Sequence, residues 1–253
     1  MKSLKSYIQE KLIIRKNKSY NNYKYFPESK EELKEIIKKR IKKDGPQVDL
    51  NDIDVSKITD MSGLFKGTKF NGDISNWDVS NVTNMNSMFF DCKNFNQDIS
   101  SWDVSNVTNM SWMFGNCKYF NQDISSWDVS SVNYMSYMFR ECESFNQNIS
   151  SWDVSNVIDM NCIFSECSKF NQNISTWDVS NVKHMSCMFY GCKVFNQDIS
   201  TWDVSNVKYM NNMFCGCKLF NKDISAWDVS NVIDMQGMFY NCSIKEKYKP
   251  KFK

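Results

Sequence analysis

The chain repeats itself every 25 residues over most of its length, and this period constrains the fold more than any other feature. The unit reads F-N-x-[DN]-I-S-x-W-D-V-S-[NS]-V-x-x-M-x-x-[MI]-F-x-x-C-x-x. A shorter unit precedes the regular ones, and in it Ile53 replaces Trp and Thr68 replaces Cys. Copies in one register without insertions indicate a solenoid in which each repeat forms one coil. The seven regular copies begin at Phe70, Phe95, Phe120, Phe145, Phe170, Phe195 and Phe220.

Two apolar patterns within the unit predict two kinds of local structure. The segment I-S-x-W-D-V alternates apolar and polar residues, which is typical of a short strand. The segment V-x-x-M-x-x-[MI]-F-x-x-C spaces apolar residues three and four apart, which favours a short helical turn. We therefore predict an α/β solenoid of about eight 25-residue coils, with the repeated Phe, Trp, Met and Ile columns as its core.

The two ends have the composition of caps. Residues 28–46 predict a helix with Ser29 as N-cap, Glu32 completing a capping box, and Gly45 with Pro46 ending it. Its apolar face should cover the first coil. A further amphipathic segment is expected over residues 4–15.

These patterns divide the chain into three parts. Residues 1–45 form a basic segment with the capping helix, residues 46–243 form the solenoid, and residues 244–253 form a basic tail. The solenoid itself comprises a degenerate first coil, 46–69, and seven regular coils, 70–243.

Charge is segregated along the chain in the same way. Residues 1–45 hold 14 Lys/Arg and 6 Asp/Glu, residues 46–243 hold 12 and 22, and the tail holds 5 and 1. An acidic body disfavours nucleic acid as a partner, because phosphates would meet carboxylates. No run approaches the roughly 18 apolar residues of a membrane span, and the start, MKSLKSYIQEKLIIRK, lacks the pattern of a signal peptide.

Two polar columns run through the repeats. The Asn after each leading Phe should satisfy backbone groups from coil to coil. The Asp of each W-D-V, from Asp78 to Asp228, needs donors, and the Ser two residues later supplies them. The alternative is a calcium-stabilised structural solenoid in which these Asp join Asp73, Asp98 and Asp123, although no glycine-rich calcium loop accompanies them. We expect no metal ligands and no cofactor.

Seven of the ten cysteines recur in phase beside Phe and Met, which predicts reduced thiols in the core. Cys162, Cys187 and Cys215 are extra. Cys162 and Cys187 occupy the same slot of adjacent coils, so a disulfide between them on oxidation stays open.

Positions that vary among the copies are where a binding surface would be built on a rigid array. Tyr134 and Tyr137, three residues apart, should share a face, with Trp112 in the preceding coil. Unselected variation on a solvated face is the alternative explanation. The candidate partner-binding residues are Trp112, Tyr134, Tyr137, His184, Tyr190 and Tyr209.

Catalytic motifs are absent from the sequence. It contains no P-loop, no G-x-S-x-G and no H-E-x-x-H, and His184 is its one histidine. We therefore expect no enzyme and no catalytic residue.

The unit F-N-Q-D-I-S-S-W-D-V-S-N-V-T-N-M-S-W-M-F-G-N-C, which starts at Phe95, resembles the BspA-like bacterial surface-protein repeat, a leucine-rich-repeat-related family of unknown function. The resemblance covers residues 27–243 and implies a right-handed, leucine-rich-repeat-like solenoid. It also implies a protein that binds other proteins, in some family members host extracellular-matrix proteins from the bacterial surface, and it brings no catalytic residues. Separately, we expect the chain to be a monomer. The lack of a recognisable signal peptide leaves an adhesin at the surface and an intracellular interaction scaffold as alternatives.

Overall fold

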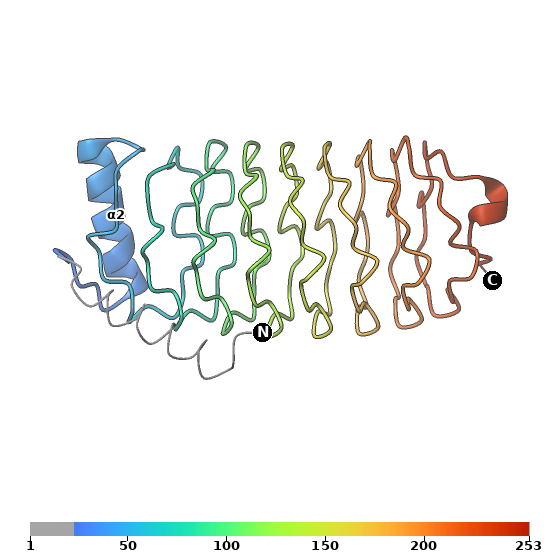
Figure 1. The fold of residues 1–253 in the computed structure, drawn as a ribbon, viewed down its shortest axis with the longest axis horizontal. Coiled ribbons are helices and arrows are strands. Elements are labelled where there is room, and N and C mark those ends of the chain that lie inside the picture. The colour runs from blue at the N-terminus through green and yellow to red at the C-terminus, as the bar shows by residue number, and fades with distance from the viewer. Residues whose placement is uncertain (1–22, 253) are drawn as a thin grey trace, which may run out of the picture.

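The computed structural model describes residues 23–252, and the coils lie side by side in one row along its long axis (Figure 1). Helix α2, Lys30–Asp44, stands at one end of the row, and a short 3-10 helix, η2, Glu246–Tyr248, stands at the other. Residues 1–22 and 253 lie outside the described residues, and so does the predicted amphipathic segment 4–15. The chain is thus a repeat solenoid, as its period predicts.

The core consists of columns of identical side chains contributed by successive coils. Phe89 stacks on Phe95, the first residue of the following repeat, with ring centroids 3.9 Å apart. It also stacks on Phe114 of the next coil, with ring centroids 5.7 Å apart. The indoles of Trp77 and Trp102 lie 6.5 Å apart and nearly parallel. These side chains are at most a few per cent exposed. Because every copy keeps the same residue at the same place, each coil packs on a copy of itself.

Polar groups within the core are satisfied between coils. The Trp102 indole N–H donates to the Ile74 carbonyl of the preceding coil at 3.2 Å, and the Cys117 thiol donates to the Phe89 carbonyl at 3.0 Å. The side-chain oxygen of Asn71 accepts from the Asn96 backbone N–H at 2.9 Å. The asparagine column therefore bonds from coil to coil as predicted, and all ten cysteines are free.

Most backbone hydrogen bonds between coils lie on one side of the solenoid. We call residues 84–91 and their counterparts in the other coils the ladder segments. In each segment except the last, four alternate backbone N–H groups donate to carbonyls of the following coil. At each interface a bond such as Thr108 N–H to Thr83 O runs the other way. The four donors of the second coil are Met85, Ser87, Phe89 and Asp91, which donate to Asn109, Ser111, Met113 and Gly115 at 2.8–2.9 Å.

The prediction of a strand and a helical turn in every coil is wrong. Among the described residues, α2 and η2 are the only helices, and coils meet through isolated parallel bridges without an extended strand. The expected strand is broken by a turn in which Trp77 N–H donates to Ile74 O at 3.2 Å. Apart from the bridge between Tyr25 and Ile53, the bridges form one column through Asp60, Asn84, Asn109, Tyr134, Asp159, His184, Tyr209 and Asp234.

Turns also explain the expected helical spacing. Met88 N–H bonds to Met85 O at 3.2 Å, and Cys92 N–H bonds to Phe89 O at 2.8 Å. The third residues of these turns, Ser87 and Asp91, have φ angles of 56° and 61°, as in type II turns. Because successive turns bring about every third residue to the inside, they produce nearly the same spacing of apolar residues as a helix does. One left-handed column comprises Gly63, Ser87, Trp112, Tyr137, Cys162, Cys187, Asn212 and Gly237; the other comprises Gly67, Asp91, Asn116, Glu141, Glu166, Gly191, Gly216 and Asn241.

Helix α2 caps the first coil as predicted. Ser29 Oγ accepts from Glu32 N–H at 3.2 Å, and Gly45, with φ 87°, ends the helix. The Glu32 carboxylate accepts from Glu28 N–H at 2.9 Å, one residue before the N-cap residue that a capping box would use. Leu33 and Ile37 are buried in the same core as the coils.

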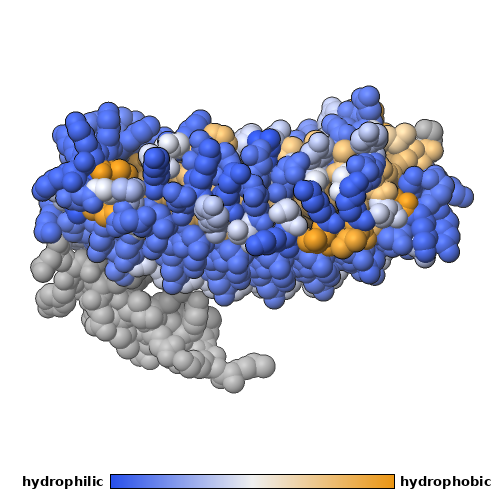
Figure 2. Space-filling view, turned by 90° about the horizontal axis from the view of Figure 1, so that it is seen from above, coloured by the Kyte–Doolittle hydropathy of each residue, from blue (hydrophilic) through white to orange (hydrophobic). Residues whose placement is uncertain are grey.

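The last coil leaves part of its pairing edge open. The backbone N–H groups that correspond to the four ladder donors have no acceptor among the described residues. Exposed apolar side chains gather at this end, where hydrophobic atoms interrupt the largely hydrophilic surface in Figure 2. The four donors are Met235, Gly237, Phe239 and Asn241; the exposed apolar residues include Leu219, Ile233, Met235 and Tyr240.

Candidate interaction face

The variable residues of the repeat lie on the ladder segments. The six candidate residues belong to three columns of this surface, which we call the ladder face. Their backbone is held by the inter-coil hydrogen bonds, so the side chains vary on a regularly spaced support.

Tyr134, His184 and Tyr209 occupy the bridge column. Tyr134 is 47 % exposed, and Asp159 separates it from His184. The His184 and Tyr209 rings stack with centroids 5.1 Å apart and planes 5° apart. The structure therefore pairs two of the candidates directly and leaves the Tyr134 ring open to solvent.

Trp112 and Tyr137 stack in one left-handed column. Their ring centroids are 4.0 Å apart with planes 4° apart, and both residues have a φ of 61°. Phe90 packs edge-on against Trp112 at 5.1 Å, and the Arg140 guanidinium lies 5.8 Å from the centre of the same ring. Both stacked side chains are half-buried, so this cluster presents a firm aromatic ridge with a cation above it.

The column continues beyond Tyr137 into Cys162 and then Cys187. Burial, together with the adjacent Cys162 thiol, raises the pKa of Tyr137 to about 12. Tyr137 therefore stays a neutral phenol, and its hydroxyl lies against the Cys162 thiol.

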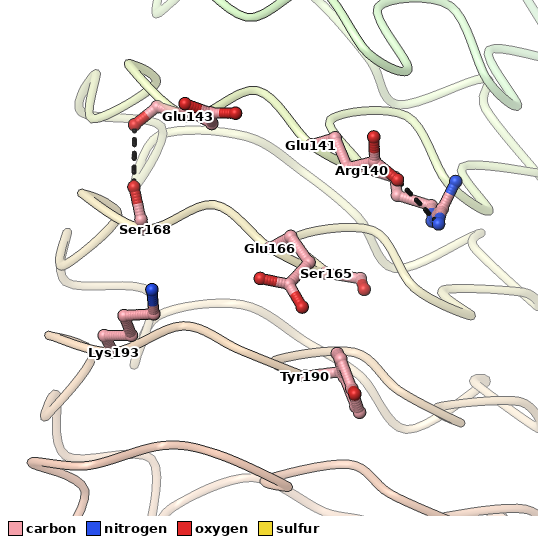
Figure 3. Close-up of a pocket in the computed structure, with 8 residues that line it drawn as sticks. All are labelled: Arg140, Glu141, Glu143, Ser165, Glu166, Ser168, Tyr190 and Lys193. Carbon is pink, nitrogen blue, oxygen red and sulfur yellow. Dashed lines mark hydrogen bonds and ion pairs between the residues drawn. The ribbon is translucent and has the colours of Figure 1, made fainter.

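Tyr190 lies beside a shallow hollow in which several charged side chains meet (Figure 3). The hollow has a volume of about 630 Å³. Glu141 pairs with Arg140 at 2.6 Å, and Glu143 pairs with Lys118 at 2.8 Å. Its lining comprises Arg140, Glu141, Glu143, Ser165, Glu166, Ser168, Tyr190 and Lys193.

A glycine makes room for one carboxylate of this hollow. A Cβ added to Gly191 would lie 2.5 Å from an oxygen of Glu166. Among the described residues, Glu166 makes no ion pair, whereas the other two glutamates do. The hollow thus offers a carboxylate that a basic group of a partner would neutralise.

The list of candidates from the sequence omitted Phe90, Arg140, Glu141 and Glu166. Arg140 and Glu141 stand at variable positions, and so does Glu166, so charge at the variable slots of neighbouring copies was the available signal. Phe90 occupies the same variable slot as Arg140 and the candidate Tyr190, so its aromatic side chain at that slot was an available signal as well.

The aspartate columns bond to serine as predicted. Ser80 donates to Asp78 Oδ1 through its hydroxyl at 2.6 Å and its backbone N–H at 3.2 Å, and Ser75 N–H donates to Asp73 Oδ1 at 2.8 Å. Within residues 23–252, no group of three or more His, Cys, Asp and Glu is placed to hold a metal ion.

No helix in the described part of the chain has the length and apolar character needed to cross a membrane.

Comparison with known proteins gives one match. The family described as Mycoplasma protein of unknown function, DUF285, matches twice, over residues 32–151 and 133–251. No curated protein and no solved structure matches the chain.

Proposed function

We propose that this chain, which belongs to the family described as Mycoplasma protein of unknown function, DUF285, is a non-enzymatic module that binds another protein through the ladder face. The observation that carries this proposal is the aromatic ridge of Trp112 and Tyr137, held on a hydrogen-bonded support beside the exposed Tyr134. Rigid aromatic side chains with a polar tip supply much of the binding energy in protein interfaces.

The finer assignment rests on the resemblance of the repeat. By that resemblance we propose a BspA-like, leucine-rich-repeat-related solenoid of right-handed winding, and we propose that it is a monomer. The resemblance also makes extracellular-matrix proteins the first class of partner to test, with an intracellular partner as the alternative.

The experiment compares binding of the purified chain to a panel of purified extracellular-matrix proteins with that of Tyr134→Ala. Tyr134 has no ring contact among the described residues, so its truncation leaves the fold intact, and we expect binding to weaken about tenfold or more. Tyr119→Ala is the matched control, because Tyr119 is 61 % exposed and lies outside the ladder segments.

A second variant, Trp112→Ala with Tyr137→Ala, should abolish binding. It also removes a ring stack worth about 0.5–1.5 kcal/mol, so its thermal midpoint has to be measured alongside. Equal binding by the wild type and Tyr134→Ala would place the partner elsewhere on the molecule. If no panel member binds, the matrix-binding assignment is wrong.

A further inference from the structure

Cys162 and Cys187 differ from the repeat cysteines in position and surroundings. The repeat cysteines from Cys92 to Cys217 are buried, and their thiols donate to Phe carbonyls of the preceding coil. Cys162 and Cys187 instead occupy the left-handed column of the ladder face, with φ angles of 54° and 55°. Cys162 is 8 % exposed, and Cys187 is more open.

The backbone holds these two residues in register on adjacent coils. Cys162 N–H donates to Ser186 O at 2.8 Å, and Cys187 N–H donates to Asn211 O at 2.9 Å. Neighbouring paired segments lie about 4.8 Å apart. A disulfide tolerates Cα separations of about 4.4–6.8 Å, so the backbone spacing of adjacent coils lies within the range that a disulfide between these two residues needs.

The two thiols also differ in acidity. The pKa of Cys187 is lowered to about 7 by a hydrogen bond with Cys162 and by the charge of Arg140, although burial alone would raise it. The same contact, together with burial, raises the pKa of Cys162. One sulfur is therefore a ready thiolate and the other a thiol beside it, which is the combination that disulfide formation requires.

We propose that Cys162 and Cys187 form an oxidisable dithiol site whose co-substrate is a hydroperoxide. The Cys187 thiolate attacks the terminal peroxide oxygen, the O–O bond breaks, and the alkoxide or hydroxide that leaves takes up a proton. The Cys187 sulfenic acid then reacts with the Cys162 thiol: an S–S bond forms, the S–O bond breaks, and water leaves. Both sulfurs are oxidised by one electron each, and the peroxide is reduced by two.

The disulfide would lie in the same column as Trp112 and Tyr137. It would fasten two coils directly beside the aromatic ridge, where the reduced coils are joined by backbone hydrogen bonds and packing. This proposal does not depend on the proposed binding function, because it concerns the two thiols alone.

The test exposes the reduced, purified chain to one equivalent of hydrogen peroxide and then blocks the remaining thiols with N-ethylmaleimide. We expect the loss of two hydrogens per chain and a Cys162–Cys187 linked peptide, assigned by its fragment ions and removed by dithiothreitol. Cys215 is the lone-thiol control: its pKa is raised by burial, so it should react at least about tenfold more slowly.

Cys167 and Cys192 are the control for spacing. They too lie at one slot of adjacent coils, but they are buried with raised pKa values, so they should remain unlinked. In Cys162→Ser, Cys187 should accumulate as a sulfenic acid that dimedone traps; in Cys187→Ser, Cys162 should stay unmodified. Protection of the repeat cysteines from N-ethylmaleimide shows that each variant is folded.

Three outcomes would overturn the site: no oxidation under these conditions, a Cys167–Cys192 link in place of the proposed one, or a sulfinic acid at Cys187 without any link.

Discussion

Residues other than glycine adopt a positive φ at corresponding positions of successive coils. Trp112, Tyr137 and Glu141 all have a φ of 61°, a conformation that costs an L-residue roughly 1–2 kcal/mol. Hydrogen bonding offsets this cost, because the turn at each position lets one backbone N–H donate to the next coil. Trp112 N–H, for example, donates to Ser136 O at 2.8 Å. The aromatic ridge is therefore built on backbone that the array constrains.

Ser87 offers a direct test of this constraint. Its counterpart in the preceding coil is Gly63, so Ser87→Gly should be as stable as the wild type or slightly more so. Ser87→Val should be less stable by about 1–2 kcal/mol, because a β-branched residue fits a positive φ poorly. Urea unfolding of the three proteins measures the difference. Equal stability of the Gly and Val variants would mean that this position is not left-handed in solution.

At the scale of elements, α2 is held to the first coil by more than its apolar face. Arg40 donates to both carboxylate oxygens of Asp52 at 2.8 and 2.9 Å and also pairs with Asp44. Its guanidinium lies 5.5 Å from the centre of the Tyr25 ring. The sequence signals that predicted α2 are local, whereas Asp52 is distant in sequence from Arg40, so this anchor could not be read from the helix pattern.

Acid should loosen this cap. Although burial favours the protonated form, hydrogen bonds from Arg40 and Lys24 hold the pKa of Asp52 below its usual 3.8. The stabilisation is therefore complete above about pH 4 and is lost as the pH falls through the lowered value. Arg40→Met should lower the free energy of unfolding by about 1–3 kcal/mol at neutral pH.

Hydrogen exchange of the α2 amides at about pH 6 and pH 3 checks the acid effect. In Asp52→Asn, the protection of the α2 amides should change less between these two pH values than it does in the wild type. An identical acid response in the two proteins would assign the loss to other carboxylates.

At the scale of the whole molecule, the period predicted the coil register and the core columns, and the local helix signals of residues 28–46 predicted the cap on the first coil. The conformation within a coil was predicted wrongly, because apolar residues three apart suit both a helix and a run of turns. Glycine at Gly63, Gly67, Gly191 and Gly216 marks the left-handed slots and was the usable signal. Trp112 and Tyr137 were expected in adjacent coils, but their ring stack depends on side-chain positions that the repeat does not specify.

Removing one full repeat should leave a folded protein. Deletion of residues 145–169 removes one coil and joins the neighbouring copies in register, so each column of core side chains continues without a gap. We expect unchanged tryptophan emission and a modest fall in the urea midpoint. Deletion of residues 145–156 shifts all following columns out of register and should unfold the remaining coils. Equal stability of the two deletions would contradict the columnar core.

The hydrogen-bonded rows of the ladder give the solenoid a polarity. In four rows every linking amide points its N–H toward the C-terminal end, so their dipoles add head to tail as in an α-helix, but with the positive pole at the C-terminal coil. That pole is formed by the N–H groups of Met235, Gly237, Phe239 and Asn241, which have no acceptor within residues 23–252. A chain segment that docks there has to present carbonyl oxygens, and two copies that met through these edges would set donor against donor. Stacking onto this array is therefore directional, like growth at one end of a polar filament.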